Sequence, residues 1–399
     1  MKITYLGILA SLLIVSCTGN SGHKTEHFDI DGVPVVRTTG DPKYEGPLFE
    51  LDSDLIIGID EGDPEWQMFA GSPRLLVAPD GRMVLVDSRR FEIFITSQDG
   101  QLMHRLGGRG SGPGEFNYIQ DVLWAEVGKE FWLTDPTTSR ITRISMEGEL
   151  IGDINYSSIK TSYERFYYLT DNQFLAQGEV LFRQDRSHAR ARYALINDQL
   201  EIEKELFEIE GREQFLSSER SRAPVPFTAG DVLIPLVDGR LLHSQPNYPR
   251  LSFYSRTGDP LLHVERDWEH ISVTQEEKDS IEKSWREAGV LESGRRIPYP
   301  DYKPPFGRPI LDSEGRIWLR SFEPMREEGT EEEPGQIIGY DYEIFSRDGV
   351  WLGTHTQRPT IRYITGEFLY QSYSSDAGAP RIERLRITPL VPEMGSIKP

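Results

Sequence analysis

A unit of four strand-like segments joined by tight turns recurs along this chain and restricts the folds open to it. The first copy occupies residues 75–106, where apolar or alternating runs are separated by turns at 79–82 and 98–100. Both turns contain Asp-Gly, a pair that favours short hairpin connections because glycine tolerates a positive φ. We therefore expect four short antiparallel β-strands, here called a to d in chain order.

A glycine- and proline-rich connector at residues 107–116 ends strand d and leads into the next copy. Further copies follow the same order with decreasing regularity. Their expected strands are 121–125, 131–135, 140–145 and 150–156; 166 onward, 174–177, 192–197 and 202–207; 232–236, 241–244, 251–255 and 261–265; 309–311, 317–320, 342–346 and 350–353; and 360–364, 367–370 and 381–387.

The last copy offers only three strands, and the missing fourth is available near the N-terminus. Residues 54–59 form a strand pattern, and residues 60–66 repeat the glycine, proline and aromatic order of the connector at 107–116. A strand from one end of the chain that completes the sheet of the other end closes a ring. Four-stranded units repeating about every 45 residues predict an all-β fold, a six-bladed β-propeller of four-stranded antiparallel blades closed by an N-terminal strand.

The first two copies carry a resemblance to a known group. Gly-Gly-Arg-Gly-Ser-Gly-Pro-Gly-Glu-Phe at 107–116, preceded by Val-Leu-Val-Asp at 84–87, resembles the NHL-repeat propellers and the six-bladed propeller lipoproteins of Gram-negative bacteria. The resemblance implies the fold but not the activity, because propellers support binding, scaffolding and several chemistries. Some six-bladed relatives are enzymes, gluconolactonase-like hydrolases and peptidylglycine α-amidating lyases, which gather metal ligands at the channel.

The N-terminus has the features of a secretion signal. Lys2 precedes an apolar stretch at residues 6–15, and Ile-Val-Ser-Cys at 14–17 resembles the lipobox of bacterial lipoproteins. The resemblance implies acylation of Cys17 and a lipid anchor in the bacterial cell envelope, with the outer membrane expected and its periplasmic or surface side left open. An ordinary secretory signal with an incidental cysteine is the alternative.

These features divide the chain into four parts. We expect a lipoprotein signal peptide at 1–16, a tether at 17–46, the propeller at 47–392 and a C-terminal tail at 393–399. Cys17 is the only cysteine, so the folded domain has no disulfide and no thiol chemistry. The formal net charge of −20 opposes nucleic acid as a partner, because binding it requires a basic face.

The long insertions all fall in connections that reach one face of a propeller. The a–b turns stay short, whereas the b–c and d–a connections contain insertions at 178–191, 208–230, 268–306 and 322–339. One elaborated face is therefore expected to carry function. The insertion at 268–306 combines a helix, begun by a capping box at Thr274, with an aromatic and proline segment containing Tyr299 and Tyr302. It is expected to form a lid over the channel mouth or, alternatively, a packing patch between blades.

Strand a lines the channel, so its first residue lies at the mouth on the inserted face. Alignment of the a–b turns places arginines and an aspartate at equivalent positions, with an arginine at the end of one strand b nearby. The candidate ligand-binding residues are Arg74, Asp121, Arg165, Arg308, Arg362 and Arg320, together with Tyr299 and Tyr302. Converging guanidinium groups bind carboxylates or phosphates bidentately. Alternatively, these arginines pair with acids such as Asp121 or the run at Glu327 and Glu328.

Other chemistries find no support in the sequence. The connector at 107–114 lacks the Gly-Lys-Ser/Thr ending of a phosphate loop, and the chain has no His-Glu-x-x-His or Gly-x-Ser-x-Gly motif. No metal and no cofactor is expected. Asp87 and Asp135, which end strands b, are expected to cap turns, and the basic run from Arg183 to Arg192 is expected to be solvated.

The leading prediction is a lipid-anchored extracytoplasmic propeller that binds a ligand, such as a small anion, or a partner protein on its inserted face. A hydrolase or lyase with its site at the channel mouth is an alternative, although arginines stand where carboxylate and histidine ligands are expected. A structural subunit of an envelope assembly is a third. The balance of these observations disfavours an enzyme.

Overall fold

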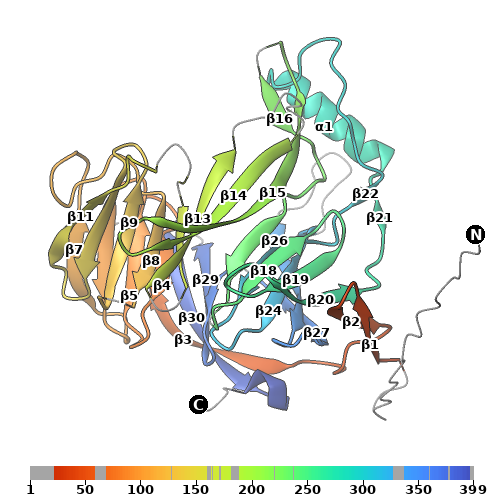
Figure 1. Ribbon diagram of the computed structural model, residues 1–399, viewed down its shortest axis with the longest axis horizontal. Coiled ribbons are helices and arrows are strands. Elements are labelled where there is room, and N and C mark those ends of the chain that lie inside the picture. The colour runs from red at the N-terminus through yellow and green to blue at the C-terminus, as the bar shows by residue number, and fades with distance from the viewer. Residues whose placement is uncertain are drawn as a thin grey trace, which may run out of the picture.

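The structure is a computed structural model, and it describes residues 22–58, 69–126, 128–159, 163, 165–169, 172–180, 188–219, 221–236, 238–326, 337–358, 360–375 and 378–395. Six small sheets are arranged as the blades of a propeller, which confirms the predicted fold (Figure 1). Sequential strands within each blade pair antiparallel, as the Asp-Gly turns require.

The strands of blade two match the sequence prediction to within one residue, and those of blade one are separated by turns at the predicted positions. Blade one contains β4 (Arg74–Val77), β5 (Met83–Asp87), β6 (Glu92–Thr96) and β7 (Leu102–Gly107). Blade two contains β8 (Asp121–Ala125), β9 (Glu130–Asp135), β10 (Arg140–Ser145) and β11 (Leu150–Asn155). Blade three contains β12 (Arg165–Tyr168), β13 (Gln173–Val180), β14 (His188–Asn197) and β15 (Ile202–Leu216), extended by β16 (Arg222–Pro224).

The remaining blades follow the same order. Blade four contains β17 (Val232–Pro235), β18 (Leu241–Gln245), β19 (Arg250–Tyr254) and β20 (Pro260–Arg266). Blade five contains β23 (Phe306–Leu311), β24 (Ile317–Ser321), β26 (Ile337–Phe345) and β27 (Trp351–Gln357), with β25 (Met325–Arg326) beside β26. Blade six contains β28 (Thr360–Ile364), β29 (Phe368–Ser374), β30 (Pro380–Pro389) and β3 (Phe49–Ile57), and the 3₁₀ turn η1 (Pro392–Met394) follows it.

Strand β3 closes the ring as predicted. It pairs antiparallel with β30 from Phe49 opposite Pro389 to Ile57 opposite Ile382. The expected connector at 60–66 lies outside the described residues. A strand from the N-terminal end thus completes the last sheet, so unfolding of the ring must separate the two ends of the chain.

Each pair of neighbouring blades shares an apolar cluster, which supplies the core. Between blades one and two, Val84 packs in one cluster with Phe131. Between blades six and one, Ile57 shares a cluster with Leu85 and Tyr370. Central strands are therefore covered on both faces, and every residue of β5 is buried. Burial of these faces against the next blade is the main stabilising contribution to a propeller.

A β-hairpin occupies part of the segment predicted as a tether. β1 (Lys24–Ile30) pairs with β2 (Val33–Thr39), and β2 adds in parallel to β20 at the outer edge of blade four. Val35 and Val36 are 1% and 6% exposed, so the hairpin buries apolar surface that an extended tether would leave in water. The tether prediction for 17–46 is therefore wrong for residues 24–39.

The insertions of blades three and four form a small substructure of their own. The insertion at 268–306 contains β21 (Ile271–Ser272), α1 (Gln275–Glu287) and β22 (Tyr302–Lys303), and Thr274 begins α1 with the predicted capping box. Trp285 stacks on Phe215 of β15, with the ring centroids 6.1 Å apart, and a separate apolar cluster forms around them.

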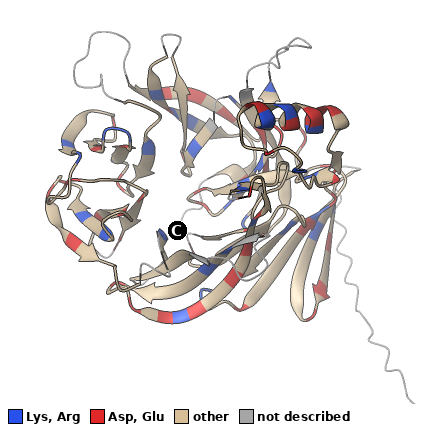
Figure 2. Ribbon diagram, turned by 90° about the horizontal axis from the view of Figure 1, so that it is seen from above, with Lys and Arg blue, Asp and Glu red and all other residues tan. Residues whose placement is uncertain are grey.

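The position of α1 favours the packing alternative over a lid. Figure 1 shows α1 beside β16, and Figure 2 shows it over one side of the ring rather than over its middle. The helix is held against the extended strand β15 by the apolar cluster that contains Phe215 and Leu291. The lid prediction for 268–306 is not supported by this arrangement.

Candidate functional site

The innermost strands of the blades form a ring around the centre. Neighbouring inner strands contact one another from β23 through β28, β4, β8 and β12 to β17. The first residues of three of them lie at the same level of their sheets, because Arg74 is opposite Val86, Asp121 opposite Thr134 and Arg165 opposite Gln177 on strand b. The strand register thus gives these three side chains equivalent positions in adjacent blades.

Asp121 lies between two arginines from the adjacent blades. Its carboxylate is 3.5 Å from Nη1 of Arg74 and 3.4 Å from Nε of Arg165. All three side chains are between 37% and 42% exposed. Burial raises the pKa of Asp121 above its usual value, and the charges of Arg165, Arg74 and Arg308 only partly offset this effect. Three arginines therefore act on one carboxylate.

Arg308 projects from β23 without a carboxylate of its own. Arg308 is exposed, and no carboxylate in the described part of the chain lies within 4.0 Å of its guanidinium nitrogens. It acts at longer range on Asp121 and on the phenol of Tyr193. Burial raises the pKa of Tyr193 to about 12, although Arg308 and Arg165 oppose the shift. Arg308 is thus a cation that can meet a ligand.

Arg320 and Arg362 extend this group of cations toward blades five and six. The guanidinium of Arg362 donates to Ser372 Oγ at 2.6 Å and to Ser72 Oγ at 3.2 Å, and that of Arg320 lies over the ring of Tyr340 at 4.3 Å. Burial lowers the pKa of Arg362, and the charge of Arg320 lowers it further. Among the described residues neither arginine has a carboxylate within 4.0 Å.

The five arginines form a continuous arc. The guanidinium of Arg320 lies beside Gly307, which precedes Arg308 in β23. The guanidinium of Arg362 donates to Ser72, two residues before Arg74. We call this set the channel mouth: Arg74, Asp121, Arg165, Arg308, Arg320 and Arg362. The expected acidic partners Glu327 and Glu328 lie outside the described residues. Guanidinium groups in such an arc can bind oxyanions with paired hydrogen bonds.

The two candidate tyrosines do not belong to the channel mouth. Tyr299 donates its hydroxyl to the carbonyl of Lys278 at 3.0 Å and packs in the apolar cluster of the insertion, so it fastens α1 to the segment that follows. Tyr302 is 52% exposed and contacts His270, with the ring centroids 5.0 Å apart. The prediction joined them to the arginines because it assumed that the insertion covers the channel.

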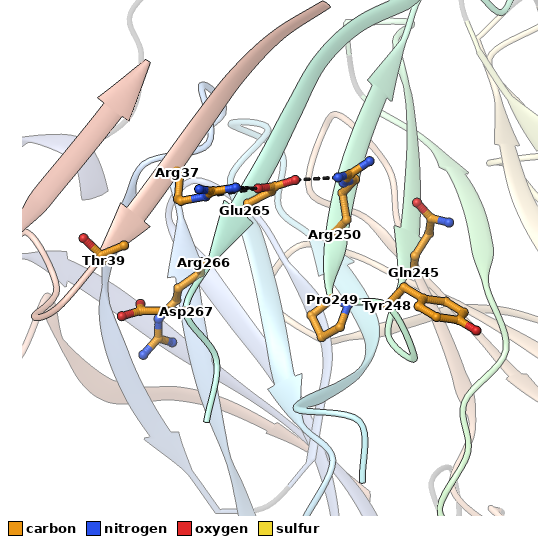
Figure 3. Close-up of a pocket in the computed structure, with 9 residues that line it drawn as sticks. All are labelled: Arg37, Thr39, Gln245, Tyr248, Pro249, Arg250, Glu265, Arg266 and Asp267. Atoms are coloured by element: carbon orange, nitrogen blue, oxygen red, sulfur yellow. Dashed lines mark hydrogen bonds and ion pairs between the residues drawn. The ribbon is translucent and has the colours of Figure 1, made fainter. Parts of the chain in front are cut away.

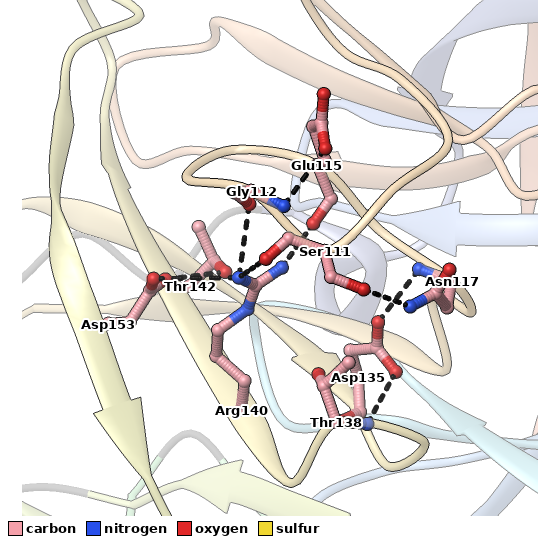
Figure 4. Close-up of polar contacts among 9 residues, drawn as sticks. All are labelled: Ser111, Gly112, Glu115, Asn117, Asp135, Thr138, Arg140, Thr142 and Asp153. Carbon is pink, nitrogen blue, oxygen red and sulfur yellow. Dashed lines mark hydrogen bonds and ion pairs between the residues drawn. The ribbon is translucent and has the colours of Figure 1, made fainter.

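The aspartates that end strands b are structural, as expected. Asp135 accepts hydrogen bonds from the backbone N–H groups of Asn117 and Thr138 (Figure 4). It also accepts them from the backbone N–H groups of Tyr118 and Thr137. Burial would raise the pKa of Asp135, but a hydrogen bond from the hydroxyl of Thr137, together with these backbone bonds, holds it below its usual value. Asp87 accepts in the same way from Ala70, Arg89 and Arg90.

The glycine-rich connector at 107–116 is bound by the side chain of Arg140. Arg140 donates to the carbonyl oxygens of Ser111 at 3.3 Å, Gly112 at 3.1 Å and Glu115 (Figure 4). Its side chain is 13% exposed and lies 3.7 Å from Asp153. The connector is therefore a turn braced by the next blade, as its lack of a phosphate-loop ending indicated.

The basic run of blade three is largely neutralised where it is described. Arg190 lies 4.0 Å from Glu208 and 3.7 Å from Glu210, and Arg192 lies 3.8 Å from Glu208. Arg183, Arg186 and the side chain of His188 lie outside the described residues. No group of three or more His, Cys, Asp or Glu side chains in the described segments is arranged to hold a metal ion.

Sequence reasoning missed a crevice between the N-terminal hairpin and blade four. Arg37 of β2 and Arg250 of β19 both bind Glu265 of β20 there (Figure 3). The signal was the apolar content of Val33–Thr39, but its partner strand lies more than two hundred residues away in the sequence. Such a parallel addition leaves no local turn signal.

Comparison with known proteins supports the fold. The six-bladed β-propeller family DUF5128 matches residues 68–223. A DUF4221 family member from Bacteroides vulgatus superposes with a TM-score of 0.53 at 12% identity, over 86% of this chain and 99% of that one. A candidate exported protein from Bacteroides fragilis gives a TM-score of 0.52 at 8% identity, over 89% and 99%. No curated protein matches the chain.

No helix within the described segments is long and apolar enough to cross a membrane. Cys17 and the signal sequence lie outside these segments, so the lipid anchor stays a prediction. The combined findings establish a six-bladed β-propeller.

Proposed function

We propose that this chain is an exported, lipid-anchored β-propeller that binds an anionic ligand at the channel mouth. The observation that carries this proposal is the arc of five arginines, of which only Arg74 and Arg165 contact a carboxylate among the described residues, that of Asp121. Like charges repel, so such an arc is costly unless an anion neutralises it. The chain as a whole has a net charge of −20, so a local excess of cations is contrary to its overall composition.

The chemistry of the arc indicates the ligand class. Arg308 is exposed and Arg320 stacks on Tyr340, so both guanidinium groups keep N–H donors for a ligand. Paired donors of this kind suit carboxylate, sulfate or phosphate groups. A ligand with two or more such groups would engage both halves of the arc.

A titration of the full-length protein with citrate and with sulfate tests the proposal. The double variant Arg308→Met/Arg362→Met is expected to bind citrate at least tenfold more weakly by calorimetry. The matched control is Arg105→Met/Arg386→Met, which removes two arginines whose side chains are 42% and 52% exposed, away from the inner strands. Equal loss in both variants, or no loss in either, would show that the channel mouth does not select anions.

The location rests on the N-terminal sequence and on the similarity to a candidate exported protein. Lipidation at Cys17 predicts that the protein partitions into the detergent phase of Triton X-114 and incorporates labelled palmitate. Cys17→Ser is expected to remove both properties. Retention of the label in this variant would overturn the anchor assignment.

A further inference from the structure

A crevice of about 680 Å³ opens between the N-terminal hairpin and the outer edge of blade four. The hairpin contributes Arg37 and Thr39, and blade four contributes Gln245, Tyr248, Pro249, Arg250, Glu265, Arg266 and Asp267 (Figure 3). This volume falls in the range of small-molecule sites, about 300–1,000 Å³. The crevice is distinct from the channel mouth, because no residue of the arginine arc lines it.

Two arginines in the crevice share one carboxylate. Arg37 donates from Nε at 3.1 Å and from Nη2 at 2.5 Å to Oε2 of Glu265, and Arg250 donates from Nη2 at 2.6 Å to Oε1. Burial would raise the pKa of Glu265, but these hydrogen bonds hold it below its usual value. Glu265 is therefore ionised at neutral pH, and its single charge neutralises only one of the two guanidinium groups that it contacts.

The arginines are oriented in advance and still accessible. Their side chains are 42% and 38% exposed, whereas that of Glu265 is 13% exposed. The ring of Phe28 in β1 supports Arg37, with the guanidinium carbon 4.9 Å from the centroid. Each guanidinium has five N–H donors, of which Arg37 uses two and Arg250 one on Glu265. The remaining donors can meet a ligand without rearrangement.

Of the other two charged residues that line the crevice, Arg266 has an ionic partner, and Asp267 contacts a backbone N–H group. Arg266 binds Glu343 and lies over the ring of Trp351 at 3.5 Å, and Asp267 accepts a hydrogen bond from the N–H of Gly40 at 3.4 Å. The rim carries a different kind of group. Tyr248 is 80% exposed, an unusual exposure for a tyrosine, and its ring is available for stacking.

We propose that this crevice binds a hexuronic acid or a similarly carboxylated polyol. The ligand carboxylate bridges the free N–H groups of Arg37 and Arg250, its hydroxyls exchange hydrogen bonds with Gln245 and Asp267, and its apolar ring face lies on Tyr248. The mixture of donors, acceptors and one aromatic ring suits a polyol, and the free N–H donors of the two guanidinium groups favour one that carries a carboxylate. Because β2 supplies Arg37, the bound ligand also joins the hairpin to blade four.

Calorimetry of the full-length protein with D-glucuronate tests the proposal. We expect binding that weakens at least tenfold in Arg37→Met and in Arg250→Met. The matched control is Arg105→Met, because Arg105 is also 42% exposed, binds Glu92 at 2.7 Å and lies over Phe94 at 5.8 Å. The channel-mouth variant Arg308→Met/Arg362→Met is expected to keep the glucuronate binding that Arg37→Met and Arg250→Met lose, which separates this site from the proposed function.

Two simpler probes define the ligand class. Methyl glucoside lacks the carboxylate and acetate lacks the ring, so both are expected to bind at least tenfold more weakly than glucuronate. If acetate binds as tightly as glucuronate, the assignment of a polyol is overturned. If methyl glucoside binds as tightly as glucuronate, the role of the arginines is overturned.

Hydrogen exchange supplies a readout that does not depend on calorimetry. Glucuronate is expected to slow exchange of the amides of β2, which pair with β20 from Val35 to Thr38. Arg250→Met leaves the hairpin sequence intact, so unchanged exchange in that variant without ligand shows that the hairpin still docks. Glucuronate binding retained in that docked variant would refute the proposal.

Discussion

Replacement of Asp121 by asparagine is predicted to tighten anion binding at the channel mouth. Asp121 is the one described carboxylate that contacts the arginine arc, so it competes with any anionic ligand for Arg74 and Arg165. The asparagine amide is a neutral group of nearly the same shape as the carboxylate. The substitution therefore removes one negative charge from the site and leaves its geometry nearly unchanged.

The magnitude follows from the distances. An anion on the far side of the same guanidinium groups would lie about 6 Å from the Asp121 oxygens, because its own contact adds about 3 Å to the 3.4 and 3.5 Å on the near side. With the dielectric constant of water, one charge at that distance is worth about 0.7 kcal/mol, and doubly charged sulfate about 1.4 kcal/mol. We use this lower limit because Asp121 is 37% exposed and water screens it. Sulfate is therefore expected to bind about tenfold more tightly at low salt.

The same carboxyl gives the site a pH dependence with a definite sign. Burial, opposed by the charges of Arg165, Arg74 and Arg308, raises the pKa of Asp121. Folding therefore favours the protonated acid, and the stabilisation is present below the unfolded pKa and lost as the pH rises through the raised value. Asp121→Asn should not lower stability at pH 7. In the unmodified protein, sulfate affinity should rise as the pH falls toward this pKa, and the variant should lose this rise.

Calorimetry with sulfate between pH 4 and 7 measures both effects. Asp153→Asn is the matched control, because Asp153 is 31% exposed and lies 3.7 Å from Arg140 outside the channel mouth. Weaker sulfate binding in Asp121→Asn would refute the reasoning, since it would mean that Asp121 orients the arginines rather than competing for them.

Three further predictions concern the fold. Arg140→Met should lower the free energy of unfolding by about 2–3 kcal/mol in urea denaturation, because three connector carbonyls lose a charged donor; an unchanged midpoint would show that the connector needs no brace. Ile57→Ala should lower the free energy of unfolding by about 3 kcal/mol, since Ile57 is 3% exposed in the cluster that closes the ring. A loss below about 1 kcal/mol in the free energy of unfolding would contradict that role. Trp285→Ala should speed proteolysis within 268–306 and leave the blades resistant, because Trp285 packs in the separate insertion cluster; cleavage spread over the blades would oppose this.

The blades could be predicted because local rules determine them. Asp-Gly turns and short apolar runs specify hairpins, and the positions of the a–b turns align equivalent residues of different blades. That alignment gives Arg74, Asp121 and Arg165 equivalent positions in three blades, and their side chains contact one another in the structure. The ring-closing strand was recognisable because its connector repeats that of the first blade.

Features that depend on distant or polar pairing could not be predicted. β15 continues to Leu216 although its sequence is highly charged, because Arg190 and Arg192 of β14 lie opposite Glu210 and Glu208. Charge pairs with β14 and the burial of Ile209 and Phe215 against distant segments both favour this extension, and a polar run by itself resembles a loop. The docking of β2 on β20 likewise depends on surfaces far apart in the chain.

The most direct test of the anion-binding account is a crystal structure with bromide, located by its anomalous scattering. The account predicts a bromide ion at the channel mouth, within hydrogen-bond distance of Arg308 or Arg362, that disappears in the Arg308→Met/Arg362→Met variant. A channel mouth without bromide, in which each of the five arginines is bound to a carboxylate of the protein, would contradict it.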